Sequence, residues 1–265
     1  MKIATFLFVS SGSPNALVLL NESVYTLKAN VCLFHAINQF LTALLIGGHT
    51  YMKGTTHLAI GTGIGAFASA YYPFTITHTV YYVSIAVISA LVADLDGPSL
   101  LSRKLSKISK WIRELVIWLG LLSTAAVIFL YFRYNLVYPE LSIMALVALL
   151  LALVAKAGVI RNILVSIVGC GMIYCGVLLE MLWLLGLGVF IAWIPWLKHR
   201  GLSHTVWAML IWGAIAWGLE RQLQVEGVAM VALAGYFSHL LADTLTPGGV
   251  KWLLPLSKKT IRLPF

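Results

Sequence analysis

The sequence predicts an all-α protein, a polytopic transmembrane helix bundle of about eight helices from residue 57 onward. Of its 265 residues, 60% are hydrophobic and only 10% are charged, and the mean hydropathy is +0.93. A soluble globular domain carries about 25% charged residues. Apolar segments also recur near the roughly 20 residues that a spanning helix needs. These observations indicate an integral membrane protein.

Eight apolar segments account for the predicted helices. They fall at residues 57–72, 77–93, 115–132, 141–157, 162–179, 181–197, 204–219 and 227–243. The weakest step is the short connection near Glu180, because one interrupted helix there would break the alternation of the connections across the membrane.

The net charge of +9 carries information about membrane topology. Basic residues fill alternate connections, above all residues 103–113 after the second helix and residues 251–262 after the eighth. The positive-inside rule therefore predicts cytoplasmic ends, counted from Met52, in a bacterial-type inner membrane. We expect residues 103–113 to form an interfacial segment on anionic lipid. Membrane lipid is the expected partner, nucleic acid is not, and the sequence makes no prediction about oligomeric state.

Residues 1–51 match the remainder of the chain poorly. They contain a broken apolar run near 31–46 without a clear charged flank, whereas Met52 directly precedes the first strong apolar helix. We expect translation to begin at Met52, with Gly47-Gly48 encoded by a ribosome-binding sequence. Residues 1–51 are then a doubtful extension and 52–265 a single membrane domain. N-terminal sequencing of the natural product that finds Met1 would overturn this expectation.

The strongest functional signal lies at the end of the last apolar helix. His239 and Asp243 are four residues apart and so share one helical face. An ionisable pair in an apolar helix is costly unless something compensates it. An imidazole and a carboxylate one turn apart are a natural pair of metal ligands.

The other histidines and aspartates of interest lie at the same predicted cytoplasmic helix ends. Asp94 and Asp96 are two residues apart, so either one binds metal while the other braces a histidine, or both reach the site from irregular backbone. His199 and His204 cannot share a helical face, but Gly201 can supply a turn between them. The candidate metal ligands are His57, Asp94, Asp96, His199, His204, His239 and Asp243.

Neutral imidazoles and carboxylates suit a divalent transition metal, with zinc expected first and manganese or iron as alternatives. A metal with an open position lowers the pKa of its bound water towards neutrality. Arg200 lies beside the site and offers a planar fork for a phosphate, so it is the predicted catalytic residue that stabilises the developing anion. Plainer interpretations remain: His239 and Asp243 could cap their helix, and Asp94 could only terminate its own.

Three other features are not expected to carry chemistry. Residues 61–66 satisfy the G-x-G-x-x-G/A dinucleotide pattern but follow no strand, so close helix packing through Gly61 and Gly65 is expected instead. Residues 201–205 lack the final glycine of a nucleophile elbow. His78 lies at the opposite end of its helix and outside the site.

Five motifs surround the candidate ligands. They are Lys-Gly-Thr-Thr-His at 53–57, Asp-Leu-Asp-Gly-Pro at 94–98, His-Arg-Gly-Leu-Ser-His-Thr at 199–205, the sequence Gly-Tyr-Phe-Ser-His-Leu-Leu-Ala-Asp-Thr-Leu-Thr-Pro-Gly-Gly-Val at 235–250, and Arg-Leu-Pro at 262–264. Together they resemble the YdjM-like family of membrane-bound metal-dependent hydrolases. The resemblance implies a distant relationship to zinc-dependent phospholipase C, and it implies the same ligand set. Short members lack most of the sequence between the second and third motifs, so residues 115–197 are expected to be a four-helix insertion in the family core.

The sequence therefore predicts a membrane-embedded metal-dependent hydrolase that cleaves a phosphoester in a lipid or lipid-linked substrate. One alternative is a metal or proton transporter, because intramembrane acids and imidazoles also build ion paths. The apolar middles of the helices favour an interfacial site over such a path. A second alternative is a non-catalytic protein whose metal clamps four helices together.

Overall fold

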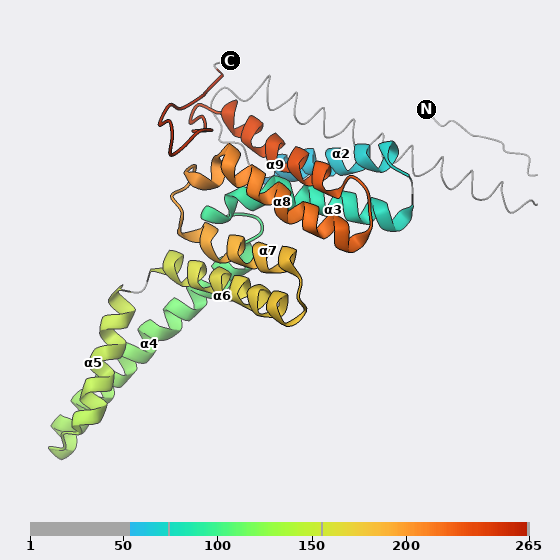
Figure 1. The fold of residues 1–265 in the computed structure, drawn as a ribbon. Coiled ribbons are helices and arrows are strands. Elements are labelled where there is room, and N and C mark those ends of the chain that lie inside the picture. Colours follow the sequence, from blue (N-terminus) through green and yellow to red (C-terminus); the bar gives the residue numbers. More distant parts are fainter. Residues whose placement is uncertain (1–53, 74, 155, 264–265) are drawn as a thin grey trace, which may run out of the picture.

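The fold is all-helical. In the computed structural model, residues 54–73, 75–154 and 156–263 are described, and within these ranges no extended strand is found beyond an isolated bridge between Val250 and Ile261. The predicted start at Met52 and everything before it lie outside the described residues. Figure 1 shows the arrangement of the helices.

The eight predicted helices are present. They are α2 (Gly54–Tyr71), α3 (Ile76–Val92), α4 (Arg103–Tyr134), α5 (Pro139–Val154), α6 (Ala157–Leu178), α7 (Leu182–Trp193), α8 (Val206–Leu223) and α9 (Val228–Thr244). Helices α6 and α7 are separate, and Glu180 between them adopts a positive φ of 53°. The short connection near Glu180 therefore reverses the chain, as the prediction of two separate helices requires.

Three helical segments are long and apolar enough to cross a membrane, namely Ile76–Asp96, Arg103–Tyr134 and Ala157–Leu178. Shorter apolar helices cover Pro139–Leu151, Leu182–Trp196 and Val228–Thr244. The helical content and these segments confirm the class of fold predicted from composition.

Helix α4 begins earlier than predicted. Its 32 residues start at Arg103 instead of residue 115, so the basic run forms the first turns of the helix and not a separate segment. No glycine or proline interrupts residues 103–115, so nothing in this run stops the helix. The helix is about 48 Å long, whereas the hydrocarbon core is about 30 Å thick. Its basic turns can therefore lie outside the hydrocarbon while the rest spans it.

Helices α2, α3, α8 and α9 form the packed bundle, in which α2, α3 and α9 pack against one another and α8 packs against α9. A Cβ atom on Gly61 of α2 would lie 2.9 Å from the Ala86 carbonyl oxygen, and one on Gly65 would overlap Val83 Cα. A Cβ on Gly235 of α9 would lie 2.7 Å from the same Ala86 oxygen, so all three helices approach closely at this point. The glycines thus serve close helix packing, as the sequence predicted for residues 61–66.

Hydrogen bonds between the helices fix their relative positions. Trp212 Nε1 of α8 donates to Ser89 Oγ of α3 at 2.8 Å. The Tyr82 hydroxyl of α3 donates to the Glu226 carbonyl before α9 at 2.6 Å. These polar contacts join α3 to α8 and to the loop before α9.

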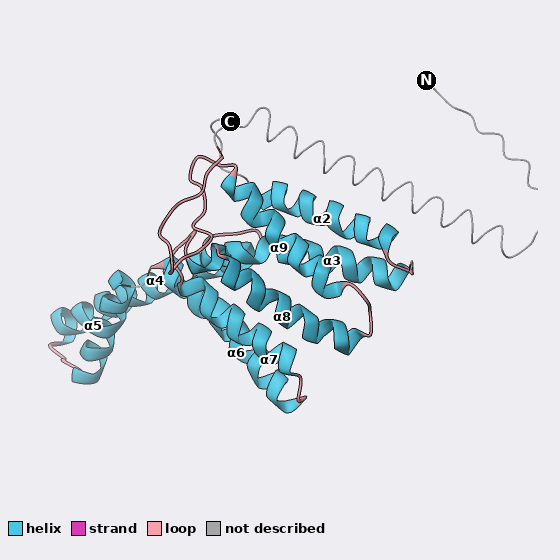
Figure 2. Cartoon of the chain, turned by 45° about the horizontal axis from the view of Figure 1, so that its top comes forward, coloured by secondary structure: helices cyan, strands magenta, loops and turns pink. Residues whose placement is uncertain are grey.

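The remaining helices lie to one side of this bundle. The α6–α7 hairpin packs against α8 through α7, and α4 contacts α6. The α4–α5 hairpin projects away from the other helices (Figures 1 and 2). Most of α4–α7 falls in residues 115–197, and their status as an insertion in a single 52–265 domain stays a prediction.

Irregular segments gather at one end of the bundle. A 3-10 turn at Ala93–Asp96 continues α3, and another at Leu202–His204 precedes α8. After α9 the chain folds back, and the Val206 N–H donates to the Trp252 carbonyl at 3.0 Å. The C-terminal segment therefore packs beside the residues that the sequence singled out.

Candidate metal centre

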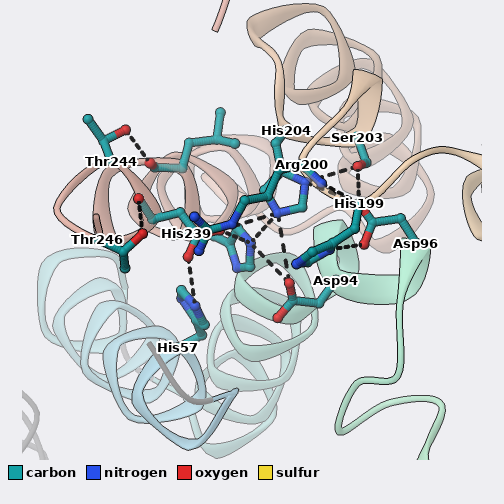
Figure 3. A network of polar contacts seen from close by, with 12 residues as sticks. His57, Asp94, Asp96, His199, Arg200, Ser203, His204, His239, Thr244 and Thr246 are labelled. Carbon is teal, nitrogen blue, oxygen red and sulfur yellow. Dashed lines mark hydrogen bonds and ion pairs between the residues drawn. The ribbon is translucent and has the colours of Figure 1, made fainter. Parts of the chain in front are cut away.

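All seven predicted ligands lie at this end of the bundle, and Figure 3 labels all of them except Asp243. They come from four segments: the first turn of α2, the 3-10 turn after α3, the loop before α8, and the last turns of α9. His78, which was predicted to lie outside the site, is at the opposite end of α3, with Nδ1 3.3 Å from the Pro73 carbonyl. The fold brings together residues that are up to 186 positions apart, from His57 to Asp243.

Five of the seven form what we call the ligand cluster: His57, Asp94, His204, His239 and Asp243. The Nε2 atoms of His204 and His239 are 3.2 Å apart. Asp94 Oδ1 lies 3.8 and 3.6 Å from these two nitrogens, and Asp243 Oδ2 lies 3.4 and 3.8 Å from them. Ligand atoms of a tetrahedral zinc site are about 3.3–3.4 Å apart when the bonds are about 2.0–2.1 Å. Each carboxylate oxygen therefore lies close to this spacing from both histidine nitrogens.

His57 is the fifth donor. Its Nε2 atom lies 3.5 Å from Asp243 Oδ1, and its ring stacks on His239 with centroids 4.1 Å apart. Donor atoms of His57, Asp94 and His239 all lie within 4.8 Å of one another. His57 is therefore within reach of an ion held by the other four residues.

The hydrogen bonds around His204 and His239 place their free lone pairs face to face. His239 Nδ1 lies 2.8 Å from the Ala90 carbonyl, which can only accept, so Nδ1 carries the hydrogen. The Ser203 hydroxyl donates to Asp96 Oδ2 at 2.6 Å and therefore accepts from His204 Nδ1 at 2.9 Å. In the neutral rings both lone pairs are then on Nε2, 3.2 Å apart. Two lone pairs at this distance repel unless a proton or a metal cation lies between them.

Asp96 faces the loop before α8 and not the ligand cluster. Its Oδ1 atom lies 2.7 Å from His199 Nδ1. Its Oδ2 atom accepts from Ser203 and from the Arg200 backbone N–H at 3.2 Å. Of the two arrangements predicted for the aspartate pair, these contacts favour the one in which Asp94 faces the metal and Asp96 braces a histidine.

His199 lies at the rim of the site, where Figure 3 shows its ring between Asp96 and Asp94. Its side chain is 56% exposed, and donor atoms of Asp94, His199 and His204 lie within 4.8 Å of one another. The hydrogen bond with Asp96 raises the pKa of His199. His199 can thus reach the edge of the site, but it is the least enclosed of the predicted ligands.

The electrostatic environment of His204 favours positive charge. Burial of this imidazole opposes protonation, but its hydrogen bonds with Asp243, Asp94 and Asp96 outweigh the burial and raise its pKa well above the ordinary value. Three carboxylates therefore surround one buried ring. The same carboxylates would stabilise a divalent cation, and ligand atoms are present on more than one side of the position it would occupy.

Arg200 lies beside the ligand cluster in an uncommon backbone conformation. Its φ of 57° is in the left-handed region, where non-glycine residues are rare and concentrate at functional sites. Its Nε atom is 3.7 Å from Asp243 Oδ2, and Nη1 donates to the Gly249 carbonyl at 3.4 Å. A Cβ atom on Gly248 would overlap Nη1. The turn after α9 thus leaves the space that the guanidinium occupies.

The site borders a cavity of about 680 Å³. Three arginines and three aspartates contribute to its wall, together with apolar and small residues. The lining residues are Gly54, His57, Asp94, Asp96, Gly97, Pro98, Ser99, Leu100, Arg103, Ser106, Arg161, His199, Arg200 and Asp243. A small anionic group can therefore approach the cluster through a cavity that contains three arginines.

Sequence reasoning missed two residues of this region. Ser203 holds Asp96 and His204 together, and its position inside the His-Arg-Gly-Leu-Ser-His motif was the available signal. Arg161 falls in the connection before the helix predicted at 162–179, but it is buried in the second turn of α6. Its apolar neighbours Val159, Ile160 and Ile163 could have indicated a helix that begins before it.

The fold and the cluster define an all-helical integral membrane protein with buried histidines and aspartates that could hold a metal ion. The chain belongs to the YdjM inner membrane protein family, whose model matches residues 52–265. No curated protein and no solved structure matched the chain in the same comparisons. The family predicted from the motifs is confirmed, while the distant similarity to zinc-dependent phospholipase C stays a prediction.

Proposed function

We propose that this protein is a membrane-embedded, metal-dependent hydrolase that cleaves a phosphoester in a lipid or lipid-linked substrate on the cytoplasmic side of the inner membrane. The observation that carries the proposal is the pair of Nε2 lone pairs of His204 and His239, 3.2 Å apart and flanked by carboxylates. The cluster also borders a cavity with three arginines. A structural ion alone has no need of such a cavity.

The donor set suits zinc best, because imidazole and carboxylate donors at tetrahedral spacing are typical of catalytic zinc sites; manganese or iron is the alternative. A bound divalent metal supplies a Lewis acid for a phosphoryl oxygen and acidifies water. The ligands in this proposal are the ligand cluster, with His199 at the rim and Asp96 as the brace of His204.

The residues of the chain supply positioning and charge. Arg200 presents a planar cation beside the cluster, where it can bind the phosphoryl oxygens and stabilise the charge that develops on them. Asp96 and Ser203 keep His204 in the tautomer with Nε2 towards the cluster. Mutation can separate charge stabilisation from positioning of the ligands, because Arg200 contacts substrate in this proposal and Asp96 does not.

Hydrolysis is tested with protein purified without chelators, stripped of metal and reloaded with zinc. Zinc is expected to restore release of phosphate from a lipid phosphoester, and His239→Ala is expected to abolish it. His78→Ala, at the other end of α3, is the matched control and should retain activity. Failure of the zinc-loaded wild type on every lipid phosphomonoester, phosphodiester and diphosphate supplied would contradict the proposal.

A structural metal clamp is the second candidate, because the cluster joins α2, the α3 extension, the loop before α8, and α9. Thermal unfolding of His239→Ala separates the two functions. A folded but inactive variant supports catalysis, whereas collapse of the purified variant supports the clamp. A transporter is less favoured, since α2, α3 and α9 carry no charged residue between the cluster and their opposite ends.

A further inference from the structure

Part of the cavity wall comes from helices that contribute nothing to the ligand cluster. Arg103 and Ser106 belong to the first turn of α4, and Arg161 belongs to the second turn of α6. Arg200, by contrast, lies against the cluster through Asp243. The basic residues of the cavity therefore fall into two groups that stand on different elements.

Arg161 is a buried cation whose direct contact is a neutral side chain, while Asp96 attracts its charge only from a distance. The residue is 7% exposed, and it makes no ion pair within the part of the chain that the structure describes. Its Nε and Nη2 atoms donate to Asn162 Oδ1 at 3.2 and 2.6 Å, and Asn162 donates to the Pro195 carbonyl at 2.7 Å. A neutral amide orients the guanidinium but does not neutralise it. Because a buried charge is costly until it is paired, Arg161 is arranged to receive an anion from the cavity.

The neighbouring turn of α4 has a second unfilled polar group. Ser106 Oγ is buried and has no hydrogen-bond partner among the described residues. The Ser102 hydroxyl donates to the Gly97 carbonyl at 3.3 Å and does not cap the helix. This end of a 32-residue helix also carries the positive end of the helix dipole. Ser106 and Arg103 therefore face the same kind of ligand as Arg161.

The charge of the cavity indicates how much anion it can hold. Its three arginines balance its three aspartates, so a bound divalent cation leaves two excess positive charges with the histidines neutral. A phosphodiester carries one negative charge and would leave part of this excess unpaired. A phosphomonoester dianion or a headgroup of two linked phosphates can match it, and the two separate groups of basic residues favour the two linked phosphates.

We propose that the substrate is a lipid with a diphosphate headgroup, with one phosphate at the ligand cluster and Arg200 and the other in an anion subsite formed by Arg103, Ser106 and Arg161. This proposal rests on the proposed function, because the first phosphate is the one that is hydrolysed. The lipid tail follows from the position of the cavity at the ends of membrane helices, with Pro98 and Leu100 in its wall.

The test measures binding and not hydrolysis, so that failure of the catalytic proposal leaves its outcome readable. Zinc-loaded full-length protein in detergent is titrated by calorimetry with two ligands. One is dodecyl phosphonate, which has no ester bond, and the other is the dodecyl ester of methylene diphosphonate, whose P–C–P bridge cannot be hydrolysed. The wild type is expected to bind the diphosphonate at least about tenfold more tightly, because a second charge-assisted contact is made. Equal affinities would overturn the proposal.

Substitution of Arg161 tests whether the anion subsite causes the preference for the diphosphonate over dodecyl phosphonate. Arg161→Gln is expected to reduce the preference to less than about twofold and to leave dodecyl phosphonate binding unchanged, because only the second phosphate loses its partner. Arg133→Gln, at the far end of α4, is the matched control and should bind like the wild type. If Arg161→Gln does not fold, Arg161→Lys keeps the charge but loses the fork and should reduce the preference in part.

Two further outcomes decide the rest of the proposal. An undiminished preference in folded Arg161→Gln and Arg161→Lys would overturn the subsite. Methylene diphosphonate without the alkyl chain is expected to bind more weakly than its dodecyl ester. Equal binding of these two ligands would overturn the assignment to a lipid.

Discussion

Helix α9 and helix α4 are both apolar, yet they differ in what surrounds them. Ten of the 17 residues of α9 are buried, including His239 and Asp243, whereas only Ser109 and Gly120 are buried among the 32 residues of α4. Helix α9 packs against α2, α3 and α8, while beyond its first turns α4 packs mainly on α5 in a hairpin that projects from the bundle. Only a helix enclosed by neighbours can hold ionisable groups against fixed partners. The comparison places the buried ionisable residues in the packed bundle and leaves most of the hairpin exposed.

The largest effect is expected from removal of a central ligand. His204→Ala should reduce zinc affinity at least about 100-fold, because the site loses one of the two Nε2 donors and the second nitrogen has no partner across the ion. The measurement is competition against a chelator of known affinity. The matched control is His78→Ala, and equal affinity of His204→Ala and the control would contradict the central role of His204.

A smaller effect is expected from the brace. Asp96→Asn should lower zinc affinity about 10–100-fold, since this is the usual cost of removing the partner that orients a metal-bound histidine. Ser203→Ala should act in the same direction and by less, because Asp96 Oδ2 remains 3.3 Å from His204 Nδ1. The same competition assay measures both. A loss with Asp96→Asn as large as that of His204→Ala would instead indicate that Asp96 is a ligand.

Alanine substitutions of glycine compare the tight packing of the α2–α3 contact with the open surface of α6. Gly65→Ala should destabilise the protein by about 1–3 kcal/mol, because the added Cβ overlaps Val83 Cα in the neighbouring helix. Gly171→Ala on α6 has no neighbouring atom within 4 Å and should stabilise by up to about 1 kcal/mol through helix propensity. Thermal unfolding in one detergent compares the two. Equal shifts in both variants would contradict the close approach of α2 to α3.

The smallest effect is expected on the hairpin. Leu122 and Leu151 are exposed on α4 and α5, so Leu122→Met and Leu151→Met should each change stability by less than about 0.5 kcal/mol. Zinc affinity should not change. A larger loss in either variant would show that the hairpin packs against a partner and does not only face lipid.

The sequence was sufficient for the fold class because hydropathy and helix length are local properties. It also predicted that His57, Asp94 and His239 meet, because charged residues in apolar helices have few tolerable positions. The predicted start of α4 was wrong because the basic run at residues 103–113 was interpreted only by its charge. The same residues also favour a helix. Arg161 was missed for the same reason, since a loop charge and a buried charge look alike until the packing is known.

The bracing role of Asp96 needed coordinates. Asp94 and Asp96 have the same side chain and are two residues apart, so their spacing left two arrangements open. The 3-10 turn at Ala93–Asp96 favours one of them, because it turns Asp96 towards Ser203 and leaves Asp94 beside His204 and His239.

The central claim is that His204 and His239 share one metal ion with the carboxylates beside them. X-ray absorption at the zinc edge of metal-loaded protein tests this claim most directly. The account predicts a first shell of nitrogen and oxygen atoms at about 2.0–2.1 Å with imidazole scattering from at least two histidines. Absence of bound zinc after loading, or a shell without imidazole, would contradict it.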